Sequence, residues 1–481
     1  MEGLEATELK LSEVHAENVS FRFDPEFFNK VALQAVYALK GNRKLSETVK
    51  SGYRVVYENT HIVERLSGIS LGLPFFLQAA DITTPFIQPE EMNCVAEGDW
   101  VRYTKGHIIP GEVLIEVKGR AEKVAIVPDD FPRKTLVTGT CYKLSVRDPL
   151  DKHLLVTFLT CRYGQALKDR LKTNLLVSFL AKDDLYSLPV PETSDELKRE
   201  ISRVFVAAEG LHKQSKRLYT HAETLLLREL GLDNVNLSDE LVYQRSFKDI
   251  EQAARFDAEC FQPKYYRLLD AIEKCGLPNQ PLIDLIEPIR NGFDYRDFTE
   301  AGTAYIRVGD VKQGRIDIAG AAKINFNSED LTKDVGLEVG DVLFTRKGSY
   351  GNAAVVRDGQ EQAIISSEIM LLRLTDEHVL PDYLALFMNS LVGKQQVERW
   401  AHGAAFYSIS QSDLAQVKVV VPIRGVQEQL TALVQRSLYT EQEAKQLLET
   451  AKRAVEVAIE DSEEAALALL KNTDAAIKEV E

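Results

Sequence analysis

The stretch GEVLIEVKGRAEKVAIV, from Gly111 to Val127, aligns without a gap with GDVLFTRKGSYGNAAVV, from Gly340 to Val356. The two stretches are 229 residues apart, and seven of the seventeen aligned pairs are identical. Self-similarity at a fixed offset indicates one structural unit that occurs more than once. We therefore expect the chain to contain two copies of one domain.

Shorter matches extend the repeat in both directions. At the same offset, Ala80-Asp81-Ile82 aligns with Gly309-Asp310-Val311. Arg22-Phe23-Asp24 opens the first half as Arg255-Phe256-Asp257 opens the second, and an aromatic-rich stretch follows each of them. The matches occur in the same order in both halves, which favours duplication of a whole domain over a chance likeness of one motif.

Within each copy, short apolar or alternating runs are separated by glycine-bearing turns, and a helix-like stretch such as 381–400 follows. Runs of this length predict strands, and the longer periodic stretch predicts a helix. Each copy closes with an apolar strand that runs into proline, at Pro191 and Pro422. The sequence therefore predicts two similar mixed α/β domains.

A long helix is expected after each copy. Thr193 and Glu196 form a capping-box pattern behind Pro191, and apolar residues then alternate steps of three and four to about Leu230. The 37 residues from 194 to 230 would span about 55 Å. A second helix with the same register follows residue 424. The predicted helix–helix seam comprises Leu197, Ile201, Val204, Leu211, Leu218, Leu225, Leu430, Val434, Leu448 and Val455.

Antiparallel pairing of these two helices inside one chain would relate the two domains by a pseudo-twofold axis. The alternative is a zipper between two copies of the chain, which costs more association entropy than pairing within one molecule. We therefore expect an α+β chain in which two long antiparallel coiled-coil helices separate the two domains.

Composition limits the class of protein. The 481 residues are 45% apolar and 27% charged, which is enough apolar surface for folding and too much length for one ordinary core. No run reaches the roughly 18 apolar residues of a membrane span, and the acidic start is unlike a signal peptide. We expect a cytoplasmic protein, with no membrane partner, whose five cysteines stay reduced.

The formal net charge of −15 argues against indiscriminate binding to nucleic acid. The acidity is strongest in the C-terminal segment 425–481, which has six basic and twelve acidic residues. The two domains are closer to balance, so each can still present a local basic surface.

Catalytic motifs are mostly missing from the sequence. It has no phosphate-binding loop, no H-E-x-x-H, no G-x-S-x-G and no N/D-P-P-Y/F cluster for holding a flipped base. Asp99, Glu116 and Lys118 have the spacing of a metal-dependent nuclease. The second copy has Thr345 where the first has Glu116, so we favour a turn element over a nuclease and expect no catalytic site and no bound metal.

A basic glycine turn recurs between two strands, as Lys118-Gly119-Arg120 and as Arg346-Lys347-Gly348. Glycine permits close approach of the backbone, and cations beside it are suited to phosphates or base edges. The alternative is a solvated hairpin with surface lysines. The candidate DNA-binding residues are Lys118, Arg120, Lys123, Arg307, Lys312, Arg315, Arg346, Lys347, Ser349, Tyr350, His402, Tyr407 and Ser408.

These residues resemble the specificity (S) subunit of type I restriction-modification systems. The second copy carries the resemblance in Tyr305 to Val311, in Gly340-Asp341-Val342-Leu343 with Gly348 to Gly351, and in Ile409-Ser410 with Asp413-Leu414. Val421-Pro422 and Gln427-Glu428-Gln429 then lead into the long helix. Each motif is short, but the ordered series occurs twice and covers nearly the whole chain.

The resemblance implies two target-recognition domains, each binding one half of a split, asymmetric sequence in double-stranded DNA. It implies that the helices dock two methyltransferase (M) subunits and that nuclease-translocase (R) subunits join this core, as in a phage-defence restriction system. S-adenosylmethionine, Mg²⁺ and ATP would belong to those partners, and this chain would hold no cofactor. The implied boundaries are 1–192 and 255–424 for the domains, 193–232 and 425–481 for the spacer helices, and 233–254 for the linker.

The first copy departs from the family pattern. It has Gly111-Glu112 for Gly340-Asp341 and Arg120-Ala121-Glu122 for Ser349-Tyr350-Gly351. Different half-sites would account for such differences, and loss of DNA contact by the first copy is the alternative. A further reading of the whole chain is a protein-binding adaptor that keeps the duplicated fold in another phage-defence complex.

Overall fold

The computed structural model describes most of the 481 residues. The described residues are 8–16, 22–54, 60–65, 69, 71–87, 89, 92–132, 134–173, 178–253, 255–325, 336–348, 351–402 and 407–473. Ser349 and Tyr350, two of the candidate DNA-binding residues, lie outside them.

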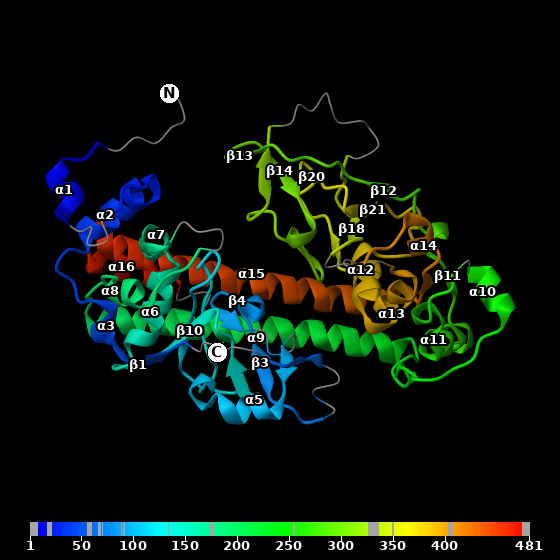
Figure 1. Cartoon of the computed structure of the whole chain (residues 1–481). Coiled ribbons are helices and arrows are strands. Elements are labelled where there is room, and N and C mark those ends of the chain that lie inside the picture. The colour runs from blue at the N-terminus through cyan, green and yellow to red at the C-terminus, as the bar shows by residue number, and fades with distance from the viewer. Residues whose placement is uncertain are drawn as a thin grey trace. The chain divides into compact units, whose positions relative to one another are not determined.

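The chain divides into two compact units, residues 1–211 with 443–481 and residues 212–442. Each unit contains one copy of the repeat and a part of both long helices, α9 (Asp195–Glu229) and α15 (Arg424–Glu460), which are drawn in green and orange in Figure 1. The predicted fold class, mixed α/β domains accompanied by two long helices, is confirmed. The pseudo-twofold relation between the domains stays a prediction.

The first unit is built on two four-stranded sheets and a hairpin. One sheet has the order β1-β10-β7-β8, the other has the order β2-β6-β3-β9, and β4 pairs with β5. The strands are β1 (Val49–Tyr53), β2 (Ile62–Val63), β3 (Phe75–Leu77), β4 (Ile82–Thr83), β5 (Phe86–Ile87), β6 (Asn93–Val95), β7 (Val113–Glu116), β8 (Val124–Ile126), β9 (Thr135–Val137) and β10 (Cys141–Val146). The helices are α1 (Leu11–Ala16), α2 (Lys30–Ala38), α3 (Leu45–Thr48), α5 (Glu97–Arg102), α6 (Asp151–Thr160), α7 (Arg162–Leu171), α8 (Lys182–Ser187) and α16 (Glu463–Lys471), with the 3-10 turns η1 (Pro25–Phe28), η2 (Ala79–Asp81) and η4 (Thr104–Gly106).

The second unit repeats this arrangement. Its two four-stranded sheets have the orders β12-β21-β18-β19 and β13-β17-β14-β20, and β15 pairs with β16. The strands are β11 (Asn279–Pro281), β12 (Arg290–Asn291), β13 (Phe298–Thr299), β14 (Thr303–Ile306), β15 (Val311–Lys312), β16 (Arg315–Ile316), β17 (Ala322–Ile324), β18 (Val342–Thr345), β19 (Ala353–Val355), β20 (Ile364–Ile365), β21 (Ile369–Leu372) and β22 (Lys418–Val420). The helices are α10 (Phe247–Ala253), α11 (Pro263–Lys274), α12 (Pro381–Asn389), α13 (Leu391–Trp400) and α14 (Gln411–Leu414), with η5 (Glu259–Phe261), η6 (Leu282–Asp284) and η7 (Val308–Asp310).

The two units share one topology. Most strands that occupy the same place in the sheet order match at an offset of 229 residues, as with β7 and β18 or β6 and β17, whereas β1 and β12 do not. The unusual parallel pair is also repeated, because β3 runs parallel to β9 and β14 runs parallel to β20. The duplication that the sequence predicts is therefore present in strand order and strand direction.

A glycine at the same place in both copies fixes how the two helices behind the sheet meet. A Cβ atom on Gly164 would lie 2.0 Å from the carbonyl oxygen of Phe158, and one on Gly393 would lie 2.3 Å from that of Phe387. No side chain fits at these distances. Glycine therefore allows α7 to fold directly back on α6, and α13 on α12.

The two ends of each domain lie side by side. In the first copy the amide of Leu45 donates to Leu188 and the amide of Val190 donates to Arg43. In the second copy β11 pairs antiparallel with β22. The part of each domain between these contacts therefore begins and ends at one place, just before the long helix that follows it.

The long helices pair within the chain. In the second unit, Ser215 and Ser437 each donate a hydroxyl hydrogen bond of 2.8 Å to the other's backbone carbonyl, and His212 contacts Glu441 at 2.8 Å. The residue numbers of the contacting pairs rise along α9 as they fall along α15, so the two helices are antiparallel. These contacts show pairing of the two helices within one chain.

Nearly all the predicted seam residues are buried. Leu197, Ile201, Val204, Leu211, Leu448 and Val455 belong to the core of the first unit, and Leu225, Leu430 and Val434 to that of the second. Leu218 is half-buried. The small serines between these leucines let the two helices approach closely enough for direct hydroxyl-to-backbone bonds.

Two helix boundaries differ from the sequence prediction. The hydroxyl that caps α9 belongs to Ser194, which accepts from the amide of Leu197, whereas the Thr193 hydroxyl is buried without a partner among the described residues. The stretch predicted as one helix over 425–481 is divided within its described part, 425–473, because Ser462 caps a new helix, α16, by accepting from the amide of Ala465.

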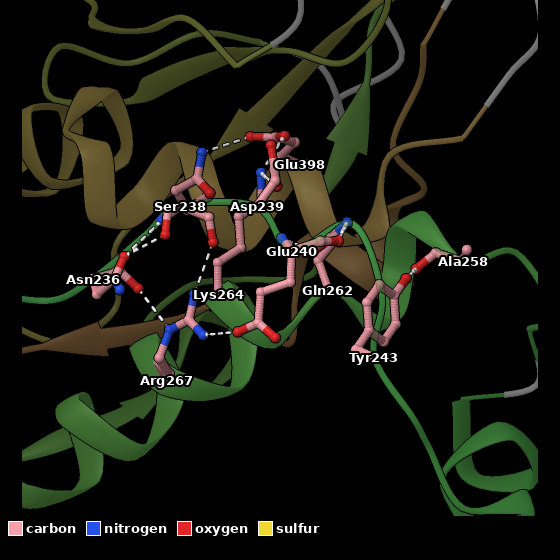
Figure 2. A network of polar contacts seen from close by, with 11 residues as sticks. Asn236, Ser238, Asp239, Glu240, Tyr243, Ala258, Gln262, Lys264, Arg267 and Glu398 are labelled. Atoms are coloured by element: carbon pink, nitrogen blue, oxygen red, sulfur yellow. Dashed lines mark hydrogen bonds and ion pairs between the residues drawn. The ribbon is translucent and has the colours of Figure 1, made fainter. Parts of the chain in front are cut away.

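The segment that follows α9 is held against the second domain by a polar network, shown in Figure 2. The Arg267 guanidinium donates to the backbone carbonyls of Asn236 and Ser238 and to the Glu240 carboxylate. The Lys264 ammonium pairs with Asp239 at 2.9 Å and with Glu398 at 3.1 Å. This part of the predicted linker therefore has a defined path along the second domain. Among the described residues, no helix is long and apolar enough to cross a membrane.

Candidate nucleic-acid interface

The two predicted glycine turns occupy equivalent places. Gly119 and Gly348 both have positive φ, 98° and 72°, a backbone conformation that disfavours other residues. Lys118 forms a β-bridge with Phe179, and its counterpart Lys347 forms one with Ser408. In each copy the turn is thus joined to the segment that follows α7 or α13.

In the first copy the turn presents Lys118 and Arg120. Both side chains are exposed, and the Arg120 side chain is 85% accessible, with only a loose 4.0 Å contact to Glu122. Lys123 behaves differently, because its ammonium donates to the backbone carbonyl of Ala79 at 2.6 Å. Lys118 and Arg120 are therefore available to a ligand, whereas Lys123 ties the turn to η2.

Buried and half-buried groups support this turn from below. The Lys168 ammonium, fully buried on α7, donates to the carbonyl of Ala121 at 2.7 Å, and Lys172 donates to the carbonyl of Arg120. The Glu116 carboxylate accepts from the amide of Lys123. Burial lowers the pKa of Lys168 to about 8, since desolvation disfavours its charged form.

In the second copy the turn lies beside His402 and Ser408. Lys347 is exposed and approaches Glu368 at 3.5 Å, and the amide and carbonyl of His402 bond the carbonyl and amide of Ser408. His402 and Tyr407 are also exposed. The structure thus brings together Lys347, His402, Tyr407 and Ser408, with Arg346 half-buried just before them.

The three remaining candidates lie elsewhere in the second domain. Arg307 is exposed, stacks over Phe298 at 5.3 Å and approaches Asp310 at 3.8 Å. Lys312 is exposed on β15. Arg315 on β16 lies 3.7 Å from Glu441 of α15, so the structure places it against the long helix.

Several motifs that carry the family resemblance have a structural role. Asp81 and Asp310 accept from the backbone amides of Gln78 and Arg307 and so close the η2 and η7 turns. Glu112 and its counterpart Asp341 are buried acids, paired with Lys143 at 2.8 Å and with Arg373 at 2.7 Å. The exchange of glutamate for aspartate between the copies therefore preserves the buried ion pair.

The Arg-Phe-Asp motif also has a structural role in both copies. Arg22 is held by Asp24 and donates to the carbonyls of Arg170 and Lys172 at the end of α7. Arg255, held by Asp257, does the same at the end of α13. The arginine beside each aspartate lowers the pKa of that carboxyl group.

The residues of the nuclease alternative serve the backbone. Asp99 accepts from the amide of His61, and Glu116 accepts from amides of its own turn. Within the described ranges, no group of three His, Cys, Asp or Glu side chains is arranged to hold a metal ion. These observations favour the turn element that the repeat suggests.

A pocket next to the first turn was not predicted. Its volume is about 340 Å³, and its lining includes Tyr53, Arg54, Tyr142, Phe179 and Lys182. The Arg54 guanidinium lies over the Phe179 ring, 4.5 Å from its centre. The signal in the sequence that could have indicated this pocket is the occurrence of cationic together with aromatic residues. Comparison of the two copies could not reveal Arg54, because it lies in a part of the chain where they do not align at a constant offset.

Comparison with known proteins gave matches among solved structures alone. No family model matches the chain, and no curated protein matches it. One similar structure is a type I restriction-modification S subunit from M. genitalium, with 12% identity over 87% of this chain and 94% of that chain and a TM-score of 0.36. Another comes from work on complex assembly and conformational transition of a type I R-M system, with 15% identity over 89% of this chain and 95% of that chain and a TM-score of 0.27. The third is the HsdS subunit from Thermoanaerobacter tengcongensis, with 13% identity over 89% of this chain and 94% of that chain and a TM-score of 0.25.

Proposed function

We propose that the chain is the DNA sequence-specificity subunit of a type I restriction-modification complex. Each recognition domain would bind one half of a bipartite, asymmetric site in double-stranded DNA. The observation that carries this proposal is that two domains of the same topology present different polar side chains at equivalent places. A protein that binds two different half-sites needs this combination.

The equivalent turns illustrate the point. The first copy presents Lys118 and Arg120, and the second presents Lys347 together with His402 and Tyr407. Basic side chains beside a glycine turn can approach phosphates closely, and aromatic or imidazole groups add contacts to base edges. A shared backbone with different side chains supports binding of both half-sites, and so favours a first copy that still contacts DNA.

The net charge bears on how the chain binds. With a formal net charge of −15 the chain as a whole repels the phosphate backbone, so the isolated chain should bind duplex DNA weakly. The proposal therefore includes two methyltransferase subunits docked on α9 and α15, with nuclease-translocase subunits joining them. S-adenosylmethionine, Mg²⁺ and ATP would bind to those partners, and the chain itself would neither cut nor methylate DNA.

The test is selection of duplexes from a random library by the full chain, with and without the methyltransferase subunit proposed as its partner. At fixed salt, the complex should enrich one bipartite motif with a constant gap, and the isolated chain should enrich it much less. Lys118→Ala with Arg120→Ala should weaken binding by the complex, whereas Lys274→Ala, a surface lysine on α11 paired with Asp270, should not. A complex that enriches no sequence would refute the proposal and favour a protein-binding adaptor.

A further inference from the structure

The pocket of the first domain lies next to the proposed DNA-binding turn. Phe179, one of its walls, is the residue that forms a β-bridge with Lys118. Tyr53 and Arg54 come from the end of β1, the outer strand of its sheet, and Lys182 comes from the start of α8. A ligand that contacts the turn therefore has this pocket beside it.

The cations of the pocket are available to a ligand. Arg54 is half-buried and stacked on Phe179, which restricts the guanidinium without using its N–H donors. Lys182 is exposed and lies 5.3 Å from the centre of the Tyr186 ring. Within the part of the chain that the structure describes, neither side chain pairs with an acid. The pocket thus offers donors at its rim and rings in its wall.

The equivalent place in the second domain has different chemistry. At the 229-residue offset, Lys182 corresponds to Gln411, and Phe179 corresponds to Ser408. The Gln411 amide nitrogen donates to the Asn291 side-chain oxygen at 2.7 Å, and Asn291 donates to the carbonyl of Ser367. A cationic and aromatic surface in one copy is thus replaced by a pair of amides in the other.

Strand pairing accounts for the cation that has no counterpart in the second copy. Lys143 and Leu371 pair with the equivalent residues Leu114 and Leu343, and they lie opposite Tyr53 and Arg290. The residues that come next along the chain, Arg54 and Asn291, therefore occupy the same place. The position of Phe179 is Ser408 in the second copy, so Asn291 contacts Gln411 instead, and Arg290 pairs with Glu287 at 2.6 Å. The two copies thus differ both at the strand (β1 or β12) and at the short helix (α8 or α14).

These two sets of side chains suit different bases. Guanine presents two acceptors, O6 and N7, to the major groove, and arginine or lysine donates to both. Adenine presents one donor, N6, and one acceptor, N7, which an asparagine or glutamine amide matches. After donating one N–H to Asn291, the Gln411 amide keeps its oxygen for N6 and a second N–H for N7.

We propose that positions 182 and 411 determine specificity in the two copies, with Lys182 and Arg54 selecting a guanine in one half-site and Gln411 and Asn291 selecting an adenine in the other. This inference rests on the proposed function, and it goes further by naming the base that each subsite recognises.

The experiment maps the motif bound by the complex of the full chain with its methyltransferase, for the wild type and for Lys182→Gln and Gln411→Lys. Lys182→Gln should lower the preference for one G·C pair in one half-site by roughly 5- to 150-fold, the range expected for loss of one bidentate base contact. Gln411→Lys should do the same at one A·T pair in the other half-site. In each case the other half-site should keep its sequence.

Lys118→Gln is the matched control, because it makes the same chemical change at the neighbouring turn. It should weaken binding to all sequences and leave the motif intact, as expected for a phosphate contact. The inference is overturned if the motif is insensitive to positions 182 and 411, if both changes alter the same half-site, or if the altered pairs are of the wrong kind. A wild-type complex with no bipartite motif would overturn the proposed function itself, so the two failures are distinguishable.

Discussion

Replacing the buried Lys168 with methionine should change how the stability of the first unit depends on pH. Burial lowers the pKa of Lys168 in the folded chain to about 8, from its ordinary value of 10.5. Between these two values the unfolded chain binds more protons at this group than the folded chain does. Stability from this group therefore rises as pH increases from about 8 to 10.5.

The magnitude follows from the size of the shift. Lowering the pKa from 10.5 to about 8 corresponds to about 3 kcal/mol of stability gained between pH 7.5 and 10.5. Because Lys168 is fully buried, solvent does not screen this effect as it would at the surface. Lys168→Met removes the titrating group, so the wild type should gain about 3 kcal/mol relative to the variant over this range.

Urea unfolding of both proteins at several pH values measures this difference directly. Other groups, such as Cys141, whose pKa burial raises to about 12, titrate in both proteins and cancel in the comparison. Val397→Met, the same residue introduced at the matching position of α13, is the control and should differ from the wild type by a constant amount. A difference between wild type and Lys168→Met that stays flat with pH would refute the reasoning.

Two further predictions concern packing and the helix pair. Gly164→Ala and Gly393→Ala should each lower the free energy of unfolding by at least about 1–3 kcal/mol, because the new Cβ atom would meet a backbone carbonyl. Gly98 has open space around it, so Gly98→Ala is the control and should have a small effect in the same urea titration. Ser215→Ala should lower stability by about 0.5–1.5 kcal/mol through loss of its bond to the Ser437 carbonyl. Adding Ser437→Ala should cost less than the sum of the two single changes, because the hydroxyls also contact each other, and strict additivity in thermal unfolding would contradict a coupled pair.

The duplicated fold could be predicted well from the sequence, because stretches of the two copies align at a constant offset. Strands that match at 229 residues, such as β7 and β18, have the same neighbours in their sheets. The heptad seam was equally informative, since buried residues such as Leu197 and Val434 must recur on one face of a helix. Periodicity could not show that Ser462 caps a separate helix, because its hydroxyl fits the same register.

The candidate site was only partly predictable. Lys118 and Lys347 are exposed at equivalent turns, but Arg315 lies against α15 and Lys123 bonds a backbone carbonyl. Sequence shows where cations occur and cannot show which of them already have a partner. Arg54 was missed for another reason: strand pairing, and not sequence alignment, relates it to the second copy.

The segments through which the chain enters and leaves each domain are bonded to each other, so the residues between them resemble an inserted unit. Because the chain enters at Leu45 and leaves at Leu188 through segments joined by backbone hydrogen bonds, a replacement has to match this narrow neck and the contacts of Arg22 with the end of α7. The same holds at β11 and β22 in the second half. Grafting a foreign domain at these necks is therefore a route to new DNA sequence preferences that leaves the length of the paired helices α9 and α15 unaltered.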